Sequence, residues 1–538
     1  MPVNYKKERH MFGSPYICVR RSASGVEFEG QASCNLGYRT KTAAGGNEEG
    51  IFACWQWDGT RLTVRNDRYG FFPLFYFRDT RGVCISTSLA KLLERGASNQ
   101  LNAAGLAVFL RLGWFIGDES PFQNILAMPP GATLEWQNGE CWITSSGLPI
   151  AKPQQIGTDD ALETYVALFR AAIHRCAPPS DEFVVPLSGG RDSRHILLEL
   201  CEAGFRPAAC LTQRKLPKSA EHVDEDVAIA AQLCGTLGIR HVVVEQNPDR
   251  LSAELRKNRQ TEFCAMEHAW GLPFADRLSA WDYAYDGIGG DMLSEGGVDV
   301  FDDGELDEDG SLLSPRRLAL FEEGKLEVLA DEILGRDDGY LPTILLEPQY
   351  RRFSRALAVE SLVAELGRHA NAPNPISSFY FHNRTRRSIA LGTLATWRAR
   401  RAVFMPYLDH ALYDFLTSLP ARFFLECQFH TEAIRRAHPS YSRIPFHSRC
   451  SSEVSGPSFD YTANCATQFA LDTGGLCLRR PRGHLLRRSS LVLRILRALV
   501  DRSYRSEVES LGALAAYLYQ LEELCDGKGV QAGWIGAI

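Results

Sequence analysis

The sequence has no long hydrophobic run, no excess of charge of one sign and no closely spaced pair of cysteines. No stretch approaches the roughly 18 consecutive apolar residues that a membrane-spanning helix requires. The first residues, MPVNYKKERHMFGSPY, also lack the apolar core of a secretion signal. We therefore expect a cytoplasmic protein that has no membrane partner.

The charges of the chain nearly balance, with 59 basic and 65 acidic side chains and a formal net charge of −6. This balance gives no reason to expect a nucleic-acid partner, because proteins that bind nucleic acid carry a basic surface. The closest of the 15 cysteines, Cys201 and Cys210, are too far apart for the C-x-x-C spacing of zinc and redox motifs. We expect reduced, mostly buried thiols that pack as small hydrophobic groups.

The composition is that of a globular protein, with 45% hydrophobic and 23% charged residues in a chain of 538. Residues 12–145 are rich in short strands, bounded by turn residues and interrupted by one helix at 103–112. The strands are predicted at 51–57, 62–65, 74–77, 84–87, 132–136 and 141–144. A Pro- and Gly-rich segment, Gly147–Thr158, then separates a first domain of residues 1–150 from a second of residues 151–538.

The second domain alternates strands with helices. Strands are predicted at 181–187, 208–212 and 241–245, and helices at 159–175, 193–203 and 224–237. Such alternation is typical of a parallel sheet that is covered by helices on both faces. After about residue 315 the pattern is almost purely helical. The sequence therefore predicts the α/β class, with an α+β first domain and a parallel-sheet domain that has a helical C-terminal half.

The segment Phe183–Ser193, FVVPLSGGRDS, joins a predicted strand directly to a predicted helix. Gly189 and Gly190 let the backbone approach an anion closely, and the helix directs its N–H groups and positive dipole end at that anion. Asp192 would repel a bare phosphate, so its presence implies a bridging Mg²⁺. Taken alone, the segment is equally consistent with a Gly-Gly turn and a helix cap. The loop also offers two hydroxyl donors: Ser188 and Ser193.

This loop resembles the pyrophosphate loop of ATP pyrophosphatases, and further segments resemble the asparagine synthetase superfamily in that family's order. The other matching segments are Arg65–Tyr76, Ser86–Leu93, Ile125–Gly131, Asp226, Tyr285–Met292 (YDGIGGDM), Met405–His410 and Ser418–Pro420. By these matches, over about residues 50–145 and 180–445, the chain is identified as a member of this superfamily. The superfamily includes glutamine-hydrolysing asparagine synthetases, β-lactam synthetases and lasso-peptide cyclases.

The resemblance implies a glutaminase-like β-sandwich of the N-terminal-nucleophile type, followed by an ATP-pyrophosphatase-type domain. It implies that ATP binds with its triphosphate on Ser188–Ser193 and that Mg²⁺ lies between Asp192 and Asp291. In the implied reaction a carboxylate attacks the α-phosphorus, pyrophosphate leaves, and an amine then attacks the acyl-adenylate. Four residues are implied to border the adenosine: Leu187, Leu211, Asp286 and Gly287.

The chain departs from the family at its catalytic positions. The family's glutaminase nucleophile is a Cys at residue 2, where this chain has Pro2, and the glutamine-binding segments are not found. We therefore expect a degenerate glutaminase domain that is retained as a scaffold. In the second domain Ile288 stands where the family has a Glu near the amine. No Lys occurs between Lys325 and Lys528, although the family uses one to stabilise the leaving pyrophosphate.

Several residues are candidates for the missing roles. Arg443, or Arg435 and Arg436, could supply the cation, because a fixed guanidinium can stabilise a developing negative charge. Glu267 and His268, on a predicted helix, could supply the acid and base, with a purely structural pair as the alternative. His195 is expected to be a packing or capping residue.

We expect an AMP- and pyrophosphate-forming amide-bond synthetase of specialised metabolism that lacks its own glutaminase activity. The alternatives are an ammonia-dependent asparagine synthetase and a non-catalytic ATP-binding member of the family. The expected partners are a small-molecule or peptide carboxylate and an amine, and a precursor peptide, a carrier protein and a homodimer are left open.

The segment Arg479–Arg505 carries nine Arg and one acid. It is expected to be a surface helix, with docking of an acidic peptide as the alternative.

Overall fold

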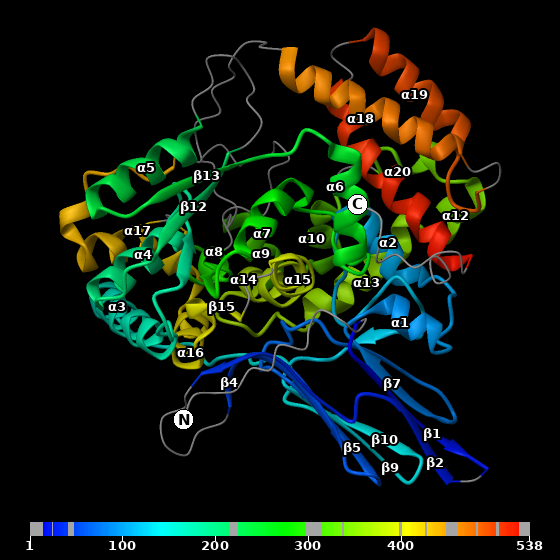
Figure 1. Cartoon of the computed structure of the whole chain (residues 1–538), viewed down its shortest axis with the longest axis horizontal. Coiled ribbons are helices and arrows are strands. Elements are labelled where there is room, and N and C mark those ends of the chain that lie inside the picture. The colour runs from blue at the N-terminus through cyan, green and yellow to red at the C-terminus, as the bar shows by residue number, and fades with distance from the viewer. Residues whose placement is uncertain are drawn as a thin grey trace.

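The computed structural model describes residues 14–23, 25–40, 48–214, 224–296, 315–335, 338–397, 401–425, 428–447, 460–479, 483–501 and 505–526. Within these residues the strands form three five-stranded sheets (Figure 1). Two sheets are antiparallel and come from the first 145 residues, whereas the third is parallel. The predicted α/β class is therefore confirmed in general terms.

The two antiparallel sheets have the strand orders β2-β1-β7-β6-β8 and β10-β9-β5-β4-β3. All six predicted strands and the helix at 103–112 are present, with strand ends shifted by one or two residues. Four strands, β1 to β3 and the two-residue β8, are not predicted. Because β2 is exposed along its whole length, it lacks the buried alternation that marks a strand in a sequence. The bounds are β1 (Tyr16–Ser22), β2 (Gly25–Gly30), β3 (Ser33–Thr40), β4 (Glu49–Trp57), β5 (Arg61–Asn66), β6 (Phe75–Arg78), β7 (Gly82–Ser86), β8 (Leu126–Ala127), β9 (Ala132–Gln137) and β10 (Glu140–Ser145), with helices α1 (Leu89–Glu94) and α2 (Ala103–Leu112).

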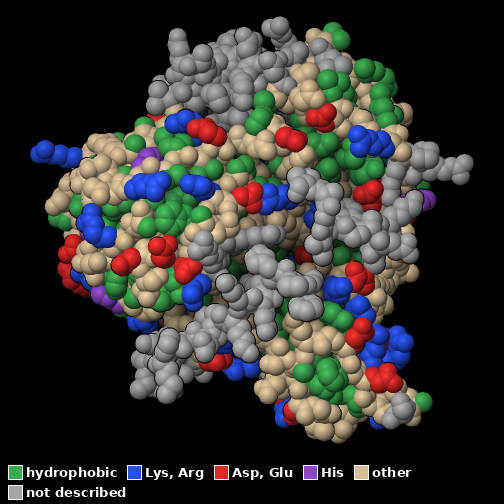
Figure 2. Space-filling model, viewed as in Figure 1, with side chains coloured by type: hydrophobic (Ala, Val, Ile, Leu, Met, Phe, Trp, Pro, Cys, Tyr) green, Lys and Arg blue, Asp and Glu red, His purple; other side chains and the backbone are tan. Residues whose placement is uncertain are grey.

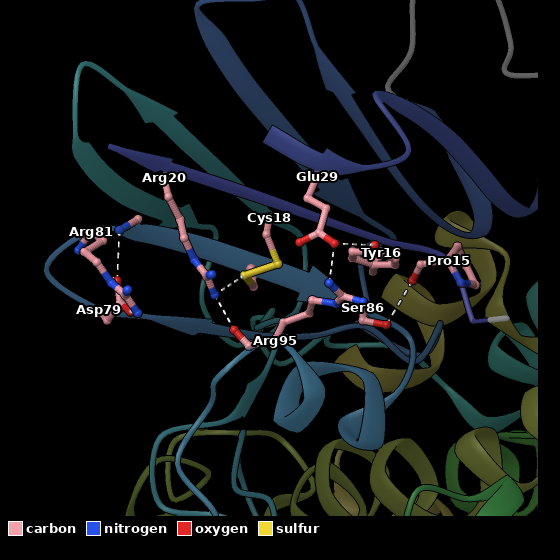
Figure 3. Close-up of a disulfide and its surroundings, with 11 residues drawn as sticks. Pro15, Tyr16, Cys18, Arg20, Glu29, Asp79, Arg81, Ser86 and Arg95 are labelled. Carbon is pink, nitrogen blue, oxygen red and sulfur yellow. Dashed lines mark hydrogen bonds and ion pairs between the residues drawn. A yellow bond between two sulfur atoms is a disulfide. The ribbon is translucent and has the colours of Figure 1, made fainter. Parts of the chain in front are cut away.

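Cys18 of β1 and Cys84 of β7 lie directly opposite each other in the antiparallel pair and form a disulfide (Figure 3). The Arg20 side chain points at the same bond, with its Nη2 atom 3.3 Å from Cys84 Sγ, and it also donates to the carbonyl oxygen of Arg95. The expectation of reduced thiols is therefore wrong for this pair. The sequence alone does not reveal this pairing, because the two cysteines are 66 positions apart and meet only through the strand register.

The parallel sheet has the strand order β13-β12-β11-β14-β15. Its strands β11 and β12 are short hydrophobic runs that are buried on both faces, as expected for a parallel sheet. The strand order reverses between β11 and β14, and ligands of such sheets bind at the carboxyl ends of the strands at this switch point. The bounds are β11 (Phe183–Pro186), β12 (Ala209–Arg214), β13 (His241–Glu245), β14 (Tyr283–Tyr285) and β15 (Ala402–Phe404).

Helices surround the parallel sheet and make up most of the chain beyond residue 245. The predicted helices are present as α3 (Thr158–Arg175), α4 (Asp192–Glu202) and α5 (Glu225–Leu237). None of the described helices combines the length and the apolar character that crossing a membrane requires. The others are α6 (Arg250–Gln260), η1 (Ala269–Gly271), α7 (Leu272–Leu278), α8 (Gly290–Ser294), α9 (Pro315–Glu322), α10 (Leu326–Ile333), α11 (Leu341–Ile344), α12 (Glu347–Arg352), α13 (Arg355–Gly367), α14 (Pro375–Tyr380), the π-helix η2 (Phe381–Ala390), α15 (Leu391–Thr396), η3 (Pro406–Leu408), α16 (His410–Ser418), η4 (Ala421–Phe423), α17 (Phe429–Ala437), η5 (Pro439–Tyr441), α18 (Asp460–Leu478), α19 (Arg488–Val500) and α20 (Arg505–Cys525).

The Arg-rich segment contains α19, which is a surface helix as predicted. Leu491 and Ile495 are buried, whereas Leu493 and Leu496 are 67% and 53% exposed. The apolar residues of this helix therefore do not all face the core. Figure 1 shows α18, α19 and α20 together at the upper right, and Figure 2 shows hydrophobic side chains at the surface in this region.

Side chains of the π-helix η2 bind the helical part of the chain to the part that contains the antiparallel sheets. Arg386, which is 4% exposed, donates to the carbonyl oxygen of Met128 at 2.8 Å and to Asp118 Oδ1 at 2.7 Å. Asn383 Oδ1 accepts a hydrogen bond from the backbone N–H of Gly117 at 2.7 Å. Buried side chains of the antiparallel sheets and of the parallel sheet belong to one hydrophobic core. The two parts are therefore joined by a buried interface.

Candidate active site

The loop Ser188–Ser193 follows β11 at the switch point and leads directly into α4. Its shape is fixed by hydrogen bonds from its own backbone. Gly189 N donates to Asp226 Oδ1 at 2.9 Å, and Gly190 N donates to Ser188 Oγ at 3.1 Å. The side chain of the N-cap residue of α4, Arg191, makes no capping hydrogen bond. The N-terminus of this helix therefore keeps backbone donors that an anion can use.

The loop that follows β14 meets the first loop at Asp192. A Cβ atom added at Gly290 would lie 2.5 Å from Asp192 Cγ, and one added at Gly287 would lie 2.7 Å from Asp192 Cβ. Only glycine at these two positions leaves room for the Asp192 side chain. Because Gly290 precedes Asp291 in the chain, the packing brings the Asp192 carboxylate to the loop that carries Asp291.

Asp192 and Asp291 are residue types that could hold the metal that the sequence analysis implies. Mg²⁺ prefers one or two carboxylates together with phosphate oxygens and water. Asp192 and Asp291 are both only partly buried, so neither carboxylate is closed off from a ligand. Burial raises the pKa of the Asp286 carboxyl to about 6, and the charge of Asp291 adds to this effect. Its Oδ1 accepts from Ile288 N at 3.1 Å, so Asp286 shapes the loop that presents Asp291.

Behind the first loop lies a buried polar group that sequence reasoning missed. Arg191 Nε donates to Thr431 Oγ1 at 2.6 Å and lies 3.3 Å from Glu295 Oε1. His430 Nδ1 lies 3.4 Å from both Asp192 Oδ1 and Glu295 Oε1. The sequence offered two signals, Arg191 inside the loop Ser188–Ser193 and Glu295 inside a Gly-rich run. Their contact with His430 could not be inferred, because His430 lies more than 130 residues further along the chain.

The predicted cation Arg443 lies at the exposed surface after η5. Arg435 and Arg436 are exposed as well, and Arg436 Nη2 donates to Asp159 Oδ1 at 2.7 Å. The role of these residues in catalysis stays a prediction.

The segment after Arg443 crosses the first loop. His447 N donates to Gly189 O at 2.9 Å, and its imidazole Nδ1 lies 3.1 Å from Glu225 Oε2. The buried Arg194 holds this segment, because Nη1 donates to Ile444 O at 2.9 Å and the guanidinium lies 4.0 Å from the Phe446 ring centroid. Two cations that contact this region are Arg191 and Arg194, which the sequence analysis did not select.

Glu267 and His268 do not lie on a helix, and the prediction of one is wrong. His268 has a φ of 70°, in the left-handed region, and immediately precedes η1. Arg384 of η2 pairs with Glu267 through Nη2–Oε2 at 2.8 Å and Nε–Oε1 at 3.1 Å. Burial raises the pKa of Glu267, but Arg384 and His268 outweigh it and bring the pKa below its usual value. Burial lowers the pKa of His268.

Arg384 connects this pair to the segment that carries Asp291, because it interacts electrostatically with both Glu267 and Asp291. The side chains of Glu267 and His268 are 27% and 40% exposed, so both can be reached from solvent. The arrangement combines an ion-paired carboxylate, an imidazole and a guanidinium that also interacts with Asp291. Sequence reasoning selected Glu267 and His268 but not Arg384, since a helical surface pattern does not distinguish one Arg of η2 from its neighbours.

The residues predicted to border adenosine belong to the same region. Leu187 N donates to Leu211 O at 2.8 Å, and the side chains of both residues are buried in the sheet. Contact of these residues with adenosine stays a prediction, as it does for Asp286 and Gly287.

The comparison with protein families concerns the first part of the chain. Residues 32–145 match the model of the glutamine amidotransferase domain. No curated protein matches the chain. The match covers β3 to β10, so we call this part the amidotransferase domain. Its presence indicates an enzyme of the amidotransferase or ligase type.

Two free thiols of the amidotransferase domain, Cys54 and Cys141, are poorly suited to nucleophilic attack. Burial raises the pKa of the Cys54 and Cys141 thiols, whereas a nucleophilic cysteine needs a lowered pKa. Cys84 is held in the disulfide with Cys18. Pro2, at the position of the family's nucleophile, lies outside the described residues.

Proposed function

We propose that the chain is an ATP-dependent, AMP- and pyrophosphate-forming amide-bond synthetase that acts through an acyl-adenylate without its own glutaminase activity. The observation that carries the proposal is the packing of Asp192 against Gly287 and Gly290 at the switch point of the parallel sheet. It joins a phosphate-type loop to a second carboxylate-bearing loop. The match of the first domain to an amidotransferase supports amide chemistry.

In this proposal each part of the site has one task. The N-terminus of α4 and the hydroxyls of Ser188 and Ser193 bind the phosphates. Asp192 and Asp291 hold Mg²⁺, which supplies charge that stabilises the leaving pyrophosphate. His268, whose pKa is lowered, accepts the proton of the attacking amine. Arg384 lowers the pKa of Glu267 and so keeps this carboxylate ionised next to His268. The imidazole therefore has a fixed electrostatic environment.

Exchange of labelled pyrophosphate into ATP tests the proposal. We expect exchange that depends on a carboxylate substrate, because adenylate formation is reversible while pyrophosphate is present. A panel of amino acids, small carboxylic acids and peptides should be screened. Exchange with aspartate, followed by asparagine formation from ammonia, would favour the ammonia-dependent asparagine synthetase. Mg·ATP binding without exchange for any acid would favour the non-catalytic family member.

We expect no glutaminase activity. Burial raises the pKa of the described thiols Cys54 and Cys141, which leaves little thiolate to attack glutamine. The measurement is glutamate release from glutamine by the purified chain, with a heat-treated sample as its control. Release above that control would contradict the prediction.

Loss of the imidazole should separate the two half-reactions. We expect His268→Ala to reduce amide formation by about 10²–10⁴-fold, the usual contribution of general acid–base catalysis. Pyrophosphate exchange should change little, because amine deprotonation comes after adenylation. His174→Ala on α3 is the control, since His174 lies in the last turn of a helix outside the proposed chemistry. Equal loss of exchange and of amide formation in His268→Ala would contradict this role.

A further inference from the structure

A second cluster of ligand-type side chains lies behind the phosphate loop and takes no part in the proposed reaction. His195 and Glu199 are four residues apart on α4, so their side chains share one face of the helix. His438 directly follows α17. These three residues are 0%, 1% and 5% exposed, and their ligand atoms lie within 4.8 Å of one another.

The contacts around His195 favour one tautomer. His430 Nδ1 lies 3.4 Å from a carboxylate oxygen of both Asp192 and Glu295, which favours a proton on this nitrogen. In a neutral His430 with this proton, Nε2 is an acceptor, and His195 Nδ1, which lies 3.2 Å away, donates to it. This assignment leaves His195 Nε2 with a lone pair. Among the described residues, that buried nitrogen has no hydrogen-bond partner.

We propose that His195 Nε2, His438 Nε2 and the Glu199 carboxylate bind a Zn²⁺ ion. Two imidazoles and one carboxylate form a ligand set that zinc takes in proteins, with a further position for water. His438 Nε2 lies 3.1 Å from Glu199 Oε1. This is close to the separation of about 3.3 Å between neighbouring ligands of a tetrahedral ion with bonds of about 2.0–2.1 Å.

The surroundings of the cluster match those of zinc sites. A zinc-bound histidine donates its other ring N–H to a fixed acceptor, as His195 does to His430. Arg170 holds the Glu199 carboxylate from the other side, through Nε–Oε2 at 3.0 Å and Nη2–Oε1 at 3.1 Å. The ion would tie α4, whose first turn carries Asp192, to the end of α17. Because the cluster is closed to solvent, the ion is acquired during folding.

Elemental analysis of the full chain, produced in zinc-supplemented medium without a histidine tag, tests the site. We expect about one zinc per chain, and we expect Glu199→Gln and His438→Gln to lose it. The matched control is His369→Asn, because His369 is also buried and lies 3.4 Å from a carboxylate four residues away, Glu365. This control should keep the zinc. A zinc content far below one per chain in the wild type would overturn the proposal, as would equal loss in the control.

Cobalt gives a second measurement that does not depend on how well the variants fold. Protein produced in cobalt-supplemented medium should show the visible absorption bands of four-coordinate Co²⁺ bound to imidazole and carboxylate. A spectrum without these bands would overturn the proposed ligand set. The site does not depend on the amide-synthetase function, so pyrophosphate exchange can fail while zinc is found, and the reverse also holds.

Discussion

Asp192→Asn and Asp291→Asn are each expected to reduce carboxylate-dependent pyrophosphate exchange by about 10²–10³-fold, as for removal of one electrostatic stabiliser of a transition state. An asparagine keeps the size of the side chain but removes the charge that binds Mg²⁺. The two losses should not add fully, because both residues hold one ion. The measurement is the initial rate of exchange at saturating ATP.

Gly290→Ala should have a comparable effect for a steric reason. The added Cβ would lie 2.5 Å from Asp192 Cγ, so the carboxylate must move away from the loop of Asp291. The matched control is Gly235→Ala on α5, where a Cβ meets nothing within 4 Å. In the interior of a helix this change should stabilise the fold by about 0.4–1 kcal/mol. Exchange that survives in Gly290→Ala as well as in Gly235→Ala would contradict the proposed geometry.

The second large effect concerns the interface with the amidotransferase domain. Arg386→Ala should lower the free energy of unfolding by about 3–5 kcal/mol, because it leaves buried carbonyl oxygens without their donor and removes a buried charge partner. The carbonyls of Gly70 and Met128 accept from Arg386 at 3.3 and 2.8 Å. The measurement is urea unfolding followed by tryptophan fluorescence.

The control for this prediction is Arg256→Ala. The Arg256–Asp276 pair is 34% and 50% exposed, and such surface pairs contribute at most about 1 kcal/mol. If Arg386→Ala and Arg256→Ala unfold at the same urea concentration, Arg386 of η2 does not stabilise the interface between the two parts of the chain.

Local sequence patterns predicted the elements that frame the site. Strand β13 has the predicted bounds, and α3, α4 and α5 begin within a residue of theirs. Their signals are local: hydrophobic runs for the buried strands, and Asp224 as the N-cap residue that accepts from Val227 N at the start of α5. The loops Ser188–Ser193 and Asp286–Asp291 could be selected because glycines mark places where backbones approach closely.

The features that were missed all depend on contacts between distant parts of the chain. Cys18 and Cys84 meet through strand register, and His430 reaches Asp192 from a helix more than 230 residues later. The helix predicted for Glu267 and His268 failed because a left-handed residue turns the chain there. The periodicity of a single sequence carries no information about such tertiary contacts.

Calorimetric titration of the wild-type chain with ATP, in the presence of Mg²⁺ and in the presence of EDTA, tests the central claim most directly. The claim is that the loops of Asp192 and Asp291 together form a Mg·ATP site. We expect binding of about one ATP per chain with Mg²⁺, strong weakening with EDTA, and the same weakening in Asp192→Asn with Mg²⁺ present. Absence of ATP binding, or equal affinity in all three titrations, would contradict the claim.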